Sequence, residues 1–254
     1  MKIVTWNIRC LWKDLDERNA FIHRAGFMYD KIMQEKPSII AFQEVNPLAY
    51  ELLKRMLTEY EFFGSFRSEN YGQEGLFVAF LKDEFSLLGA DSFWMSPTPY
   101  VAGSKFAEQS DCPRVCVYVR LLCKKSLEVL NLFDLHLDHI SDSAKKLGLG
   151  VLFDYIEKRS DAVNKDKTVI LGDFNALKDS ETMAFAREQS WLIDSTKDLT
   201  TTFHDFGAES GRQIDYVLIS KALEDKIQKV GTWTDEHFGI YLSDHYPVCL
   251  ELTE

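Results

Sequence analysis

The pattern of apolar and polar residues along the chain predicts more strands than helices. Runs rich in β-branched and aromatic residues are typical of strands. Such runs occupy residues 2–8, 38–42, 76–81, 114–122, 127–135, 168–171, 214–219 and 247–250. Several of them follow one another without a helical segment between them, which favours a layered α/β sandwich with mixed sheets over a doubly wound parallel sheet.

Helical periodicity is clear in three further segments. The apolar positions that recur on one face are Phe21, Ala25, Met28 and Ile32 in the first segment, Leu48, Leu52, Leu53 and Met56 in the second, and Leu147, Val151, Leu152, Tyr155 and Ile156 in the third. The second helix also carries a start signal, because Asn46 is a preferred N-cap residue and Pro47 suits the first helical position.

The longest stretch without periodicity covers residues 91–113. We expect an irregular loop there, and loops of that length are commonly functional or mobile. Trp94, within this stretch, is either a core or loop anchor or a platform for stacking bases. The sequence has no Ser/Gly-rich linker, internal repeat or low-complexity block, so residues 1–254 are predicted to form a single domain.

The charge balance weighs against polyanionic partners. With 29 basic and 40 acidic residues, the net charge of −11 opposes long-range attraction to DNA, RNA or anionic membranes. The five cysteines are odd in number and lack CxxC spacing, so neither a disulfide framework nor a zinc site is predicted. The N-terminus lacks a signal-peptide pattern, and no apolar run approaches the roughly 20 residues needed to cross a bilayer. These features predict a cytoplasmic protein with no membrane partner and no obligate protein partner.

Polar side chains suited to chemistry gather at the carboxyl ends of the predicted strands, where open α/β folds place their sites. Each has a structural explanation when taken alone, such as a turn, a helix start or a paired core residue. The set comprises Asn7, Glu44, His136, Asp138, His139, Asp173, Asn175, Asp215, Asp244 and His245. As a whole it combines hard oxygen ligands for Mg²⁺ or Mn²⁺ with histidines that exchange protons near neutral pH, which suits phosphoester cleavage.

The GDFN stretch places a carboxylate and a carboxamide at the tip of a buried strand. Asp173 and Asn175 are two positions apart, so in an extended segment both side chains point to one face. One of them would accept a proton or bind metal while the other holds a phosphate oxygen.

Seven short motifs follow one another along the chain: TWNIR, QEV, HLDH, GDFNA, TF, IDYV and SDHYPV. In order and approximate spacing they resemble the endonuclease/exonuclease/phosphatase superfamily, and the similarity extends over residues 2–250. The stretch FWMSPTP, followed by GS and PR, is also similar to bacterial members of unassigned substrate. The resemblance implies a four-layer α/β sandwich with two packed mixed β-sheets, the deoxyribonuclease-like fold.

The resemblance also implies a Mg²⁺-dependent phosphoester hydrolase, with Mn²⁺ as the alternative cofactor. Glu44 is the implied principal metal ligand, with Asn7 beside it and Asp244 close to the metal. His245 is the implied catalytic histidine, held by Asp215.

Further roles follow from the same motifs. Asp173 and Asn175 match the pair that activates or orients the nucleophile and contacts the phosphate. His136 resembles a second histidine that contacts the phosphate, and Glu74 matches the acidic residue that often orients this histidine.

Substrate choice is expected to depend on one loop and on the positions where this chain departs from the family pattern. Arg114 and the loop of residues 93–113 are expected to hold what lies beyond the scissile phosphate, with Asp138 as a supporting residue. Where many relatives read NTHLD this chain reads DLHLD, so that Asp134 and Leu135 replace Asn and Thr.

The predicted substrate is a phosphoester presented at one end. It is either a small soluble phosphoester or the 3′ end of a single-stranded nucleic acid, because a chain at −11 lacks the basic face that a duplex requires. The alternative of another class is a non-catalytic binding protein on the same fold. The motif residues argue against this alternative, since a protein that had lost catalysis should have lost some of them.

Overall fold

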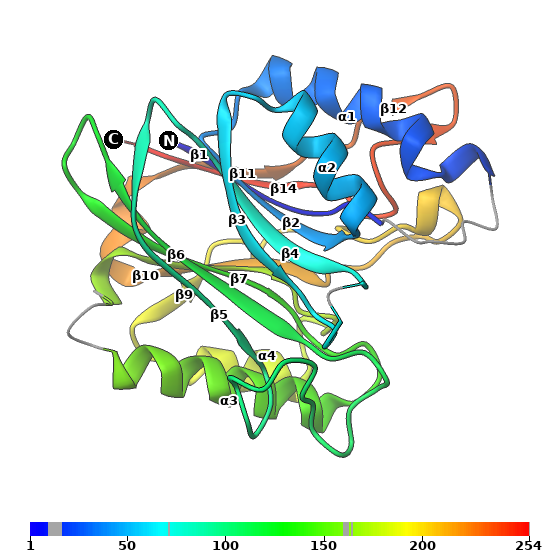
Figure 1. The fold of residues 1–254 in the computed structure, drawn as a ribbon. Helices are drawn as coiled ribbons and strands as arrows, with labels where there is room; N and C mark the ends of the chain where they lie inside the picture. Colours follow the sequence, from blue (N-terminus) through cyan, green and yellow to red (C-terminus); the bar gives the residue numbers. More distant parts are fainter. Residues whose placement is uncertain (10–16, 71, 160–162, 164, 254) are drawn as a thin grey trace.

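The structure, a computed structural model, describes residues 1–9, 17–70, 72–159, 163 and 165–253. In this part of the chain two sheets pack face to face and helices cover their outer faces (Figure 1). The predicted α/β sandwich with two mixed sheets is confirmed. The two chain ends lie side by side, since the amino group of Met1 donates to the carbonyl of Leu252 at 2.9 Å.

The first sheet has the N-terminal strand near its centre. Its strands within the described residues lie in the order β11 (Ile227–Thr232), β14 (Val248–Leu252), β1 (Lys2–Asn7), β2 (Ile39–Val45), β4 (Gly75–Leu81) and β3 (Tyr60–Phe66). β1 and β2 are parallel, with Asn7 opposite Gln43, whereas the other neighbours are antiparallel. The carboxyl ends of β1 and β2 therefore meet at the same edge.

The second sheet repeats this arrangement. Its described strands lie in the order β5 (Phe85–Trp94), β6 (Val115–Cys123), β7 (Val129–His136), β8 (Thr168–Asp173), β10 (Asp215–Ser220) and β9 (Leu192–Asp194). The parallel pair is β7 and β8, with His136 opposite Asp173, and the antiparallel β10 places Asp215 on the other side of Asp173. Three of the predicted site residues thus lie side by side where these strands end or begin.

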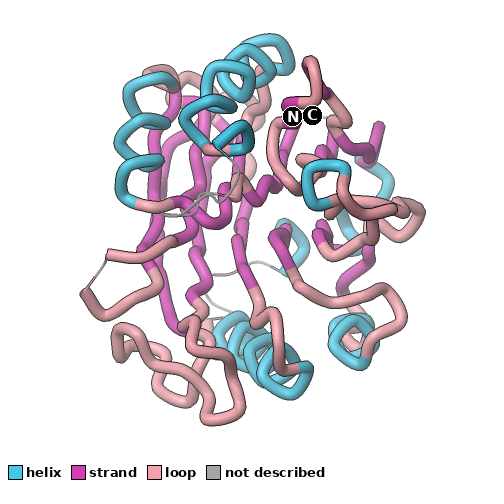
Figure 2. The backbone as a smooth tube through the Cα atoms, turned by 90° about the vertical axis from the view of Figure 1, so that its right-hand side faces the viewer, coloured by secondary structure: helices cyan, strands magenta, loops and turns pink. Residues whose placement is uncertain are grey.

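Helices form the two outer layers, and Figure 2 shows most of them on opposite sides of the strands. α1 (Phe21–Glu35) and α2 (Pro47–Met56) cover the first sheet, whereas α3 (Asp142–Lys158) and α4 (Glu181–Arg187) cover the second. The remaining short elements are the hairpin of β12 (Glu236–His237) and β13 (Ile240–Tyr241) and the 3₁₀ turns η1 (Glu17–Asn19), η2 (Lys165–Lys167), η3 (Asp205–Gly207) and η4 (Lys221–Lys226). None of the described helices is both long and apolar enough to cross a membrane.

Three apolar clusters separate the four layers. Val78 and Leu171 belong to the cluster between the sheets, Met28 to the cluster under α1, and Leu152 to the cluster under α3. Full burial of an aliphatic or aromatic side chain contributes about 1.5–3 kcal/mol. The sandwich is therefore stabilised at each of its three internal surfaces, and its strand edges are held firmly enough to position side chains.

Several elements differ from the sequence-based predictions. Residues 91–94 belong to β5, so the irregular loop begins only at Met95, whose amide donates to the carbonyl of Arg114 at 2.8 Å. β3, β5, β9, β11, the short strands β12 and β13, and α4 were not predicted; β3 is mostly half-exposed, which weakens its strand pattern. Leu48 and Leu147, predicted on buried helix faces, are exposed. Cys10 lies outside the described residues, and the other four cysteines form no disulfide within the described part of the chain.

A buried polar bridge joins the two sheets just behind the strand ends. Gln43 of β2 donates to Thr5 of β1 at 3.0 Å and to Asp134 of β7 at 2.7 Å. Asp134 is 0% exposed, and burial raises the pKa of its carboxyl well above the ordinary value. The departure from the family pattern at this position thus places a carboxyl group with a raised pKa between the sheets.

Candidate active site

Asn7, at the end of β1, joins the two sheets at the candidate site. Its side-chain amide donates to Oε1 of Glu44 at 3.1 Å and to Oδ2 of Asp173 at 3.0 Å. Asn7 is 1% exposed, so its orientation is fixed by these bonds and by the packing around it. One amide therefore connects a predicted metal ligand on the first sheet with the GDFN aspartate on the second.

The sequence predicted Glu44 just past the second strand, but Glu44 lies within β2. The pairing of β2 with β4 shifts register between Phe42 and Val45, and Glu44 adopts a φ of 60° there. A bulge of this kind redirects a side chain at a strand end. The Oε2 atom of Glu44 is buried and has no hydrogen-bond partner among the described residues.

The GDFN stretch turns more sharply than an extended segment. A Cβ at Gly172 would lie 1.9 Å from the carbonyl oxygen of Leu135, so only glycine fits where β8 meets β7. The strand ends at Asp173, and Asn175 has a φ of 47°, so the prediction of an extended segment was wrong. The backbone amide of Asn175 donates to Oδ1 of Asp173 at 2.8 Å, and the side-chain nitrogen of Asn175 donates to the carbonyl of Leu137 at 3.2 Å.

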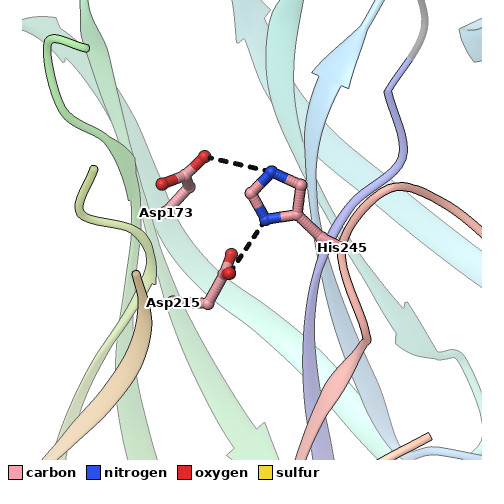
Figure 3. A group of neighbouring side chains, drawn as sticks. All are labelled: Asp173, Asp215 and His245. Atoms are coloured by element: carbon pink, nitrogen blue, oxygen red, sulfur yellow. Dashed lines mark hydrogen bonds and ion pairs between the residues drawn. The ribbon is translucent and has the colours of Figure 1, made fainter. Parts of the chain in front are cut away.

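His245 lies between two carboxylates, as Figure 3 shows. Its Nδ1 is 2.9 Å from Oδ2 of Asp215, and its Nε2 is 3.8 Å from Oδ2 of Asp173. Burial alone would lower the pKa of His245, but the charge and hydrogen bond of Asp215 raise it to about 10. Burial, reinforced by the charge of Asp215, raises the pKa of Asp173 to about 7. Near neutral pH the site therefore contains an imidazolium beside a carboxyl group that can exchange its proton.

Asp215 is itself held by Thr202. The Thr202 hydroxyl accepts from the backbone amides of Ile214 and Asp215, each at 3.0 Å. Phe203, the next residue, packs its ring edge-on to His245 with 5.0 Å between centroids. The TF motif thus positions the His245–Asp215 pair from the side.

Two buried carboxylates fit a divalent cation. Oε2 of Glu44 and Oδ2 of Asp244 lack hydrogen-bond partners among the described residues. Burial, and then the charge of Glu44, raise the pKa of Asp244 even though His245 opposes the shift. A cation would relieve this repulsion, and hard oxygen ligands are those that Mg²⁺ prefers. Asp173, Asp215 and His245 form another compact group whose ligand atoms lie within 4.8 Å, but the direct His245–Asp215 hydrogen bond suits proton transfer better than metal binding.

His136 and Arg114 line the other side of Asp173. Nε2 of His136 is 3.4 Å from Oδ2 of Asp173, and burial followed by the charge of Arg114 keeps the pKa of His136 well below its ordinary value. Arg114 is 4% exposed; its Nη2 lies 3.0 Å from Nδ1 of His139, and its Nε and Nη1 have no hydrogen-bond partner among the described residues. A buried guanidinium with unused donors is suited to an anion.

Asp138 ties the loop to the start of α3. It accepts from the Ser110 hydroxyl and from the backbone amides of Ser141 at 2.8 Å and Ile140 at 3.2 Å. Although burial opposes the shift, these bonds hold the pKa of Asp138 below its ordinary value. Its carboxylate also lies 3.9 Å from Nε of Arg114. Asp138 therefore fixes the loop beside Arg114.

Glu74 pairs with Arg67, not with His136 as the family pattern had suggested. Its Oε2 lies 3.0 Å from Nη2 of Arg67. Burial and the charge of Glu44 raise the pKa of Glu74 to about 7, against the opposing charge of Arg67. Arg67 was not predicted as a site residue, because it follows β3, a strand that the apolar pattern did not reveal.

A larger cavity of about 960 Å³ lies apart from these residues, between the loop after β5 and α3. Its lining is mostly apolar and includes Tyr100, Phe106, Leu147 and Gly150. Trp94 does not line it: its ring is buried and donates to the carbonyl of Arg67 at 2.7 Å, so it anchors the loop. The cavity shares no lining residue with the carboxylate cluster.

Comparison with known proteins bears on the motifs and on the fold. A sequence profile described as the Endonuclease/Exonuclease/phosphatase family matches residues 4–245. The chain belongs to this family. Members of the endonuclease/exonuclease/phosphatase family are metal-dependent phosphoester hydrolases, and this chain is one of them. A search of the curated proteins gave no significant match.

Solved structures of the family show the same fold. A family member from Bacteroides vulgatus is 22% identical, with a TM-score of 0.89 over 99% of this chain and 98% of that one. A mannosyl-6-phosphatase from Bacteroides thetaiotaomicron is 22% identical, with a TM-score of 0.88 over 100% of both chains. The D. rerio protein TDP2, in complex with a single-strand DNA product, is 16% identical, with a TM-score of 0.73 over 100% of this chain and 99% of that one.

Proposed function

We propose that the protein is a Mg²⁺-dependent hydrolase of small phosphoesters, with Mn²⁺ as the alternative ion. The observation that carries the proposal is the convergence of Asn7, Glu44 and Asp173 from two different sheets, beside the buried His245–Asp215 pair. Hard oxygen ligands, a proton acceptor and a cationic imidazole are the groups that phosphoester hydrolysis requires at one place.

Asp173 serves as the proton acceptor for the attacking water. Its pKa of about 7 allows it to take up a proton near neutral pH. The Asn7 amide and the Asn175 backbone amide donate to its two oxygens, which fixes the direction of the carboxylate. His245, protonated and oriented by Asp215, donates to a phosphoryl oxygen and stabilises its charge.

The remaining phosphoryl oxygens are held by the side chains that surround Asp173. The N–H donors come from Asn175 and His136, which lie beside Asp173, and from Arg114. Arg114 also supplies positive charge. A divalent ion held by Glu44, with Asn7 and Asp244, would supply the further positive charge that phosphoester cleavage requires when it is bound.

The charge of the chain and the structural neighbours support the proposed substrate class. A net charge of −11 disfavours a long polyanion, and the mannosyl-6-phosphatase neighbour acts on a small phosphomonoester. The loop that carries Phe106 lines the apolar cavity and leads on to Arg114, and we propose that this cavity holds the part of the substrate beyond the phosphate. A second candidate is the 3′ end of a single-stranded nucleic acid; the TDP2 complex with a single-strand DNA product supports a single-stranded substrate.

A substrate panel with Mg²⁺ tests the proposal. It contains hexose 6-phosphates, p-nitrophenyl phosphate, bis-p-nitrophenyl phosphate, a 5′-labelled single-stranded oligonucleotide and supercoiled plasmid, each with an EDTA control and an Asp173→Asn variant. Metal-dependent phosphate release from the small esters is expected. Stepwise shortening of the oligonucleotide selects the second candidate, and efficient plasmid nicking contradicts both. No hydrolysis of any substrate would favour a binding protein on the same fold.

A further inference from the structure

Arg24, in the first half of α1, is a fully buried cation outside every motif. Its side chain is 0% exposed. The guanidinium has five N–H donors, and among the described residues five hydrogen bonds run from it to backbone carbonyls. These are Nε to Asn19 at 2.7 Å, Nη1 to Ile8 at 3.0 Å and Leu242 at 2.7 Å, and Nη2 to Ile8 at 3.0 Å and Arg9 at 2.7 Å.

Two of the segments that Arg24 joins carry oxygen ligands of the candidate site. The Arg9 segment follows Asn7 directly, and the Arg9 amide donates to Oδ1 of Asn7 at 3.0 Å. Leu242 comes two residues before Asp244, whose Oδ2 lies 3.6 Å from Nε of Arg9. A single rigid group therefore sets the separation between the turn that holds Asn7 and the segment that holds Asp244.

The turn after Asn7 needs such support. Arg9 has a φ of 46°, in the left-handed region that non-glycine residues adopt at a cost. The Arg24 bond to the Arg9 carbonyl opposes relaxation of this turn. Lysine cannot replace this function, because an ammonium is a point charge with three donors and not a planar fork that reaches several segments at once.

We propose that Arg24 is a positioning residue for the divalent-metal site, which it acts on through the Asn7 turn and the Asp244 segment. The inference rests on the proposed function, because it takes Asn7 and Asp244 as ligands of the ion. Residues that orient ligands without touching the metal typically change metal affinity or activity by about 10- to 100-fold when they are substituted.

The test compares Arg24→Lys with a matched control, Lys31→Met. Lys31 is a second buried cation of the same helix, but it pairs with Glu35 at 2.9 Å and Asp235 at 2.9 Å rather than with the Asn7 or Asp244 segments. Binding of Mn²⁺ is measured directly by electron paramagnetic resonance, on protein shown to be folded by circular dichroism. Arg24→Lys should raise the Kd for Mn²⁺ about tenfold or more, whereas Lys31→Met should lower thermal stability and leave this Kd unchanged.

The possible results separate this inference from the proposed function. Absence of Mn²⁺ binding by the unmodified protein would contradict the proposed function itself. Normal Mn²⁺ affinity in Arg24→Lys, with a loss of stability like that of Lys31→Met, would show that Arg24 is only structural. Arg24→Gln serves as a second variant. If neither Arg24 variant folds even at low temperature, the inference is also overturned, because Arg24 is then required for folding itself. Partial recovery of activity by Arg24→Lys at saturating Mn²⁺ would support it.

Discussion

Replacement of Asp134 by asparagine should remove a pH-dependent loss of stability. Asp134 is completely buried between the sheets, its Oδ1 accepts from Gln43 at 2.7 Å, and its Oδ2 has no hydrogen-bond partner among the described residues. Burial raises the pKa of this carboxyl well above its ordinary value. Asparagine has the same shape, keeps the acceptor oxygen for Gln43 and carries no titrating proton.

The sign and size of the effect follow from proton linkage. Because the pKa of Asp134 is higher in the folded protein, the unfolded chain releases this proton first as the pH rises. The folded protein therefore loses stability from the unfolded pKa, about 3.9, up to the folded pKa. Within that window each pH unit costs about 1.4 kcal/mol of unfolding free energy. The free energy of unfolding of Asp134→Asn should therefore rise, relative to that of the unmodified protein, by about this amount per pH unit.

Urea unfolding at a series of pH values from about 5 upward measures this difference. Asp179→Asn is the control, because Asp179 is exposed and undergoes the same change of charge. If the stability difference between Asp134→Asn and the unmodified protein does not change with pH, then burial does not raise the pKa of Asp134. An advantage of the unmodified protein over Asp134→Asn that grows as the pH rises would also refute the prediction, since this would mean that folding lowers the pKa of Asp134.

Three further predictions concern the site. Glu44→Ala should raise the Mg²⁺ concentration needed for half-maximal rate, whereas His245→Ala should lower the rate at saturating Mg²⁺ by about 10²-fold; equal effects on metal affinity would contradict this division of roles. Arg114→Met should lower kcat/KM by roughly thirtyfold, equivalent to about 2 kcal/mol for a lost charged hydrogen bond, and an unchanged kcat/KM would place Arg114 outside the substrate site. Gly150→Leu should raise KM and leave kcat unchanged, because a Cβ at Gly150 meets no atom within 4 Å and the added side chain fills the cavity; an unchanged KM would mean that the substrate does not reach the cavity.

The sequence predicted the strands that carry the site, because β1, β2, β7 and β8 are buried on both faces and read as short apolar runs. Their parallel pairing brings Asn7 near Glu44 and His136 beside Asp173, and polar residues at strand ends indicated this meeting point. The asparagine cap and the first helical proline of α2 were likewise readable, since both are local signals.

Other features depend on contacts between distant segments and left no local signal. The bulge at Glu44 and the left-handed turn at Asn175 are backbone features that neighbouring strands impose. The role of Arg24 depends on where the carbonyls of three separate segments lie, and the partner of Glu74 depends on the end of a half-exposed strand. Tertiary packing therefore decides which charged residues serve the site.

One measurement tests most directly whether the carboxylate cluster around Asp173 hydrolyses phosphoesters. It is the initial rate of phosphate release from the best small phosphoester, measured against Mg²⁺ concentration for the unmodified protein and for Asp173→Asn. We expect a rate that saturates with Mg²⁺, disappears with EDTA and falls by about 10²-fold or more in Asp173→Asn, because the substitution removes the proton acceptor. A rate that is independent of the metal, or that survives in Asp173→Asn, would contradict the central claim that this carboxylate cluster hydrolyses phosphoesters.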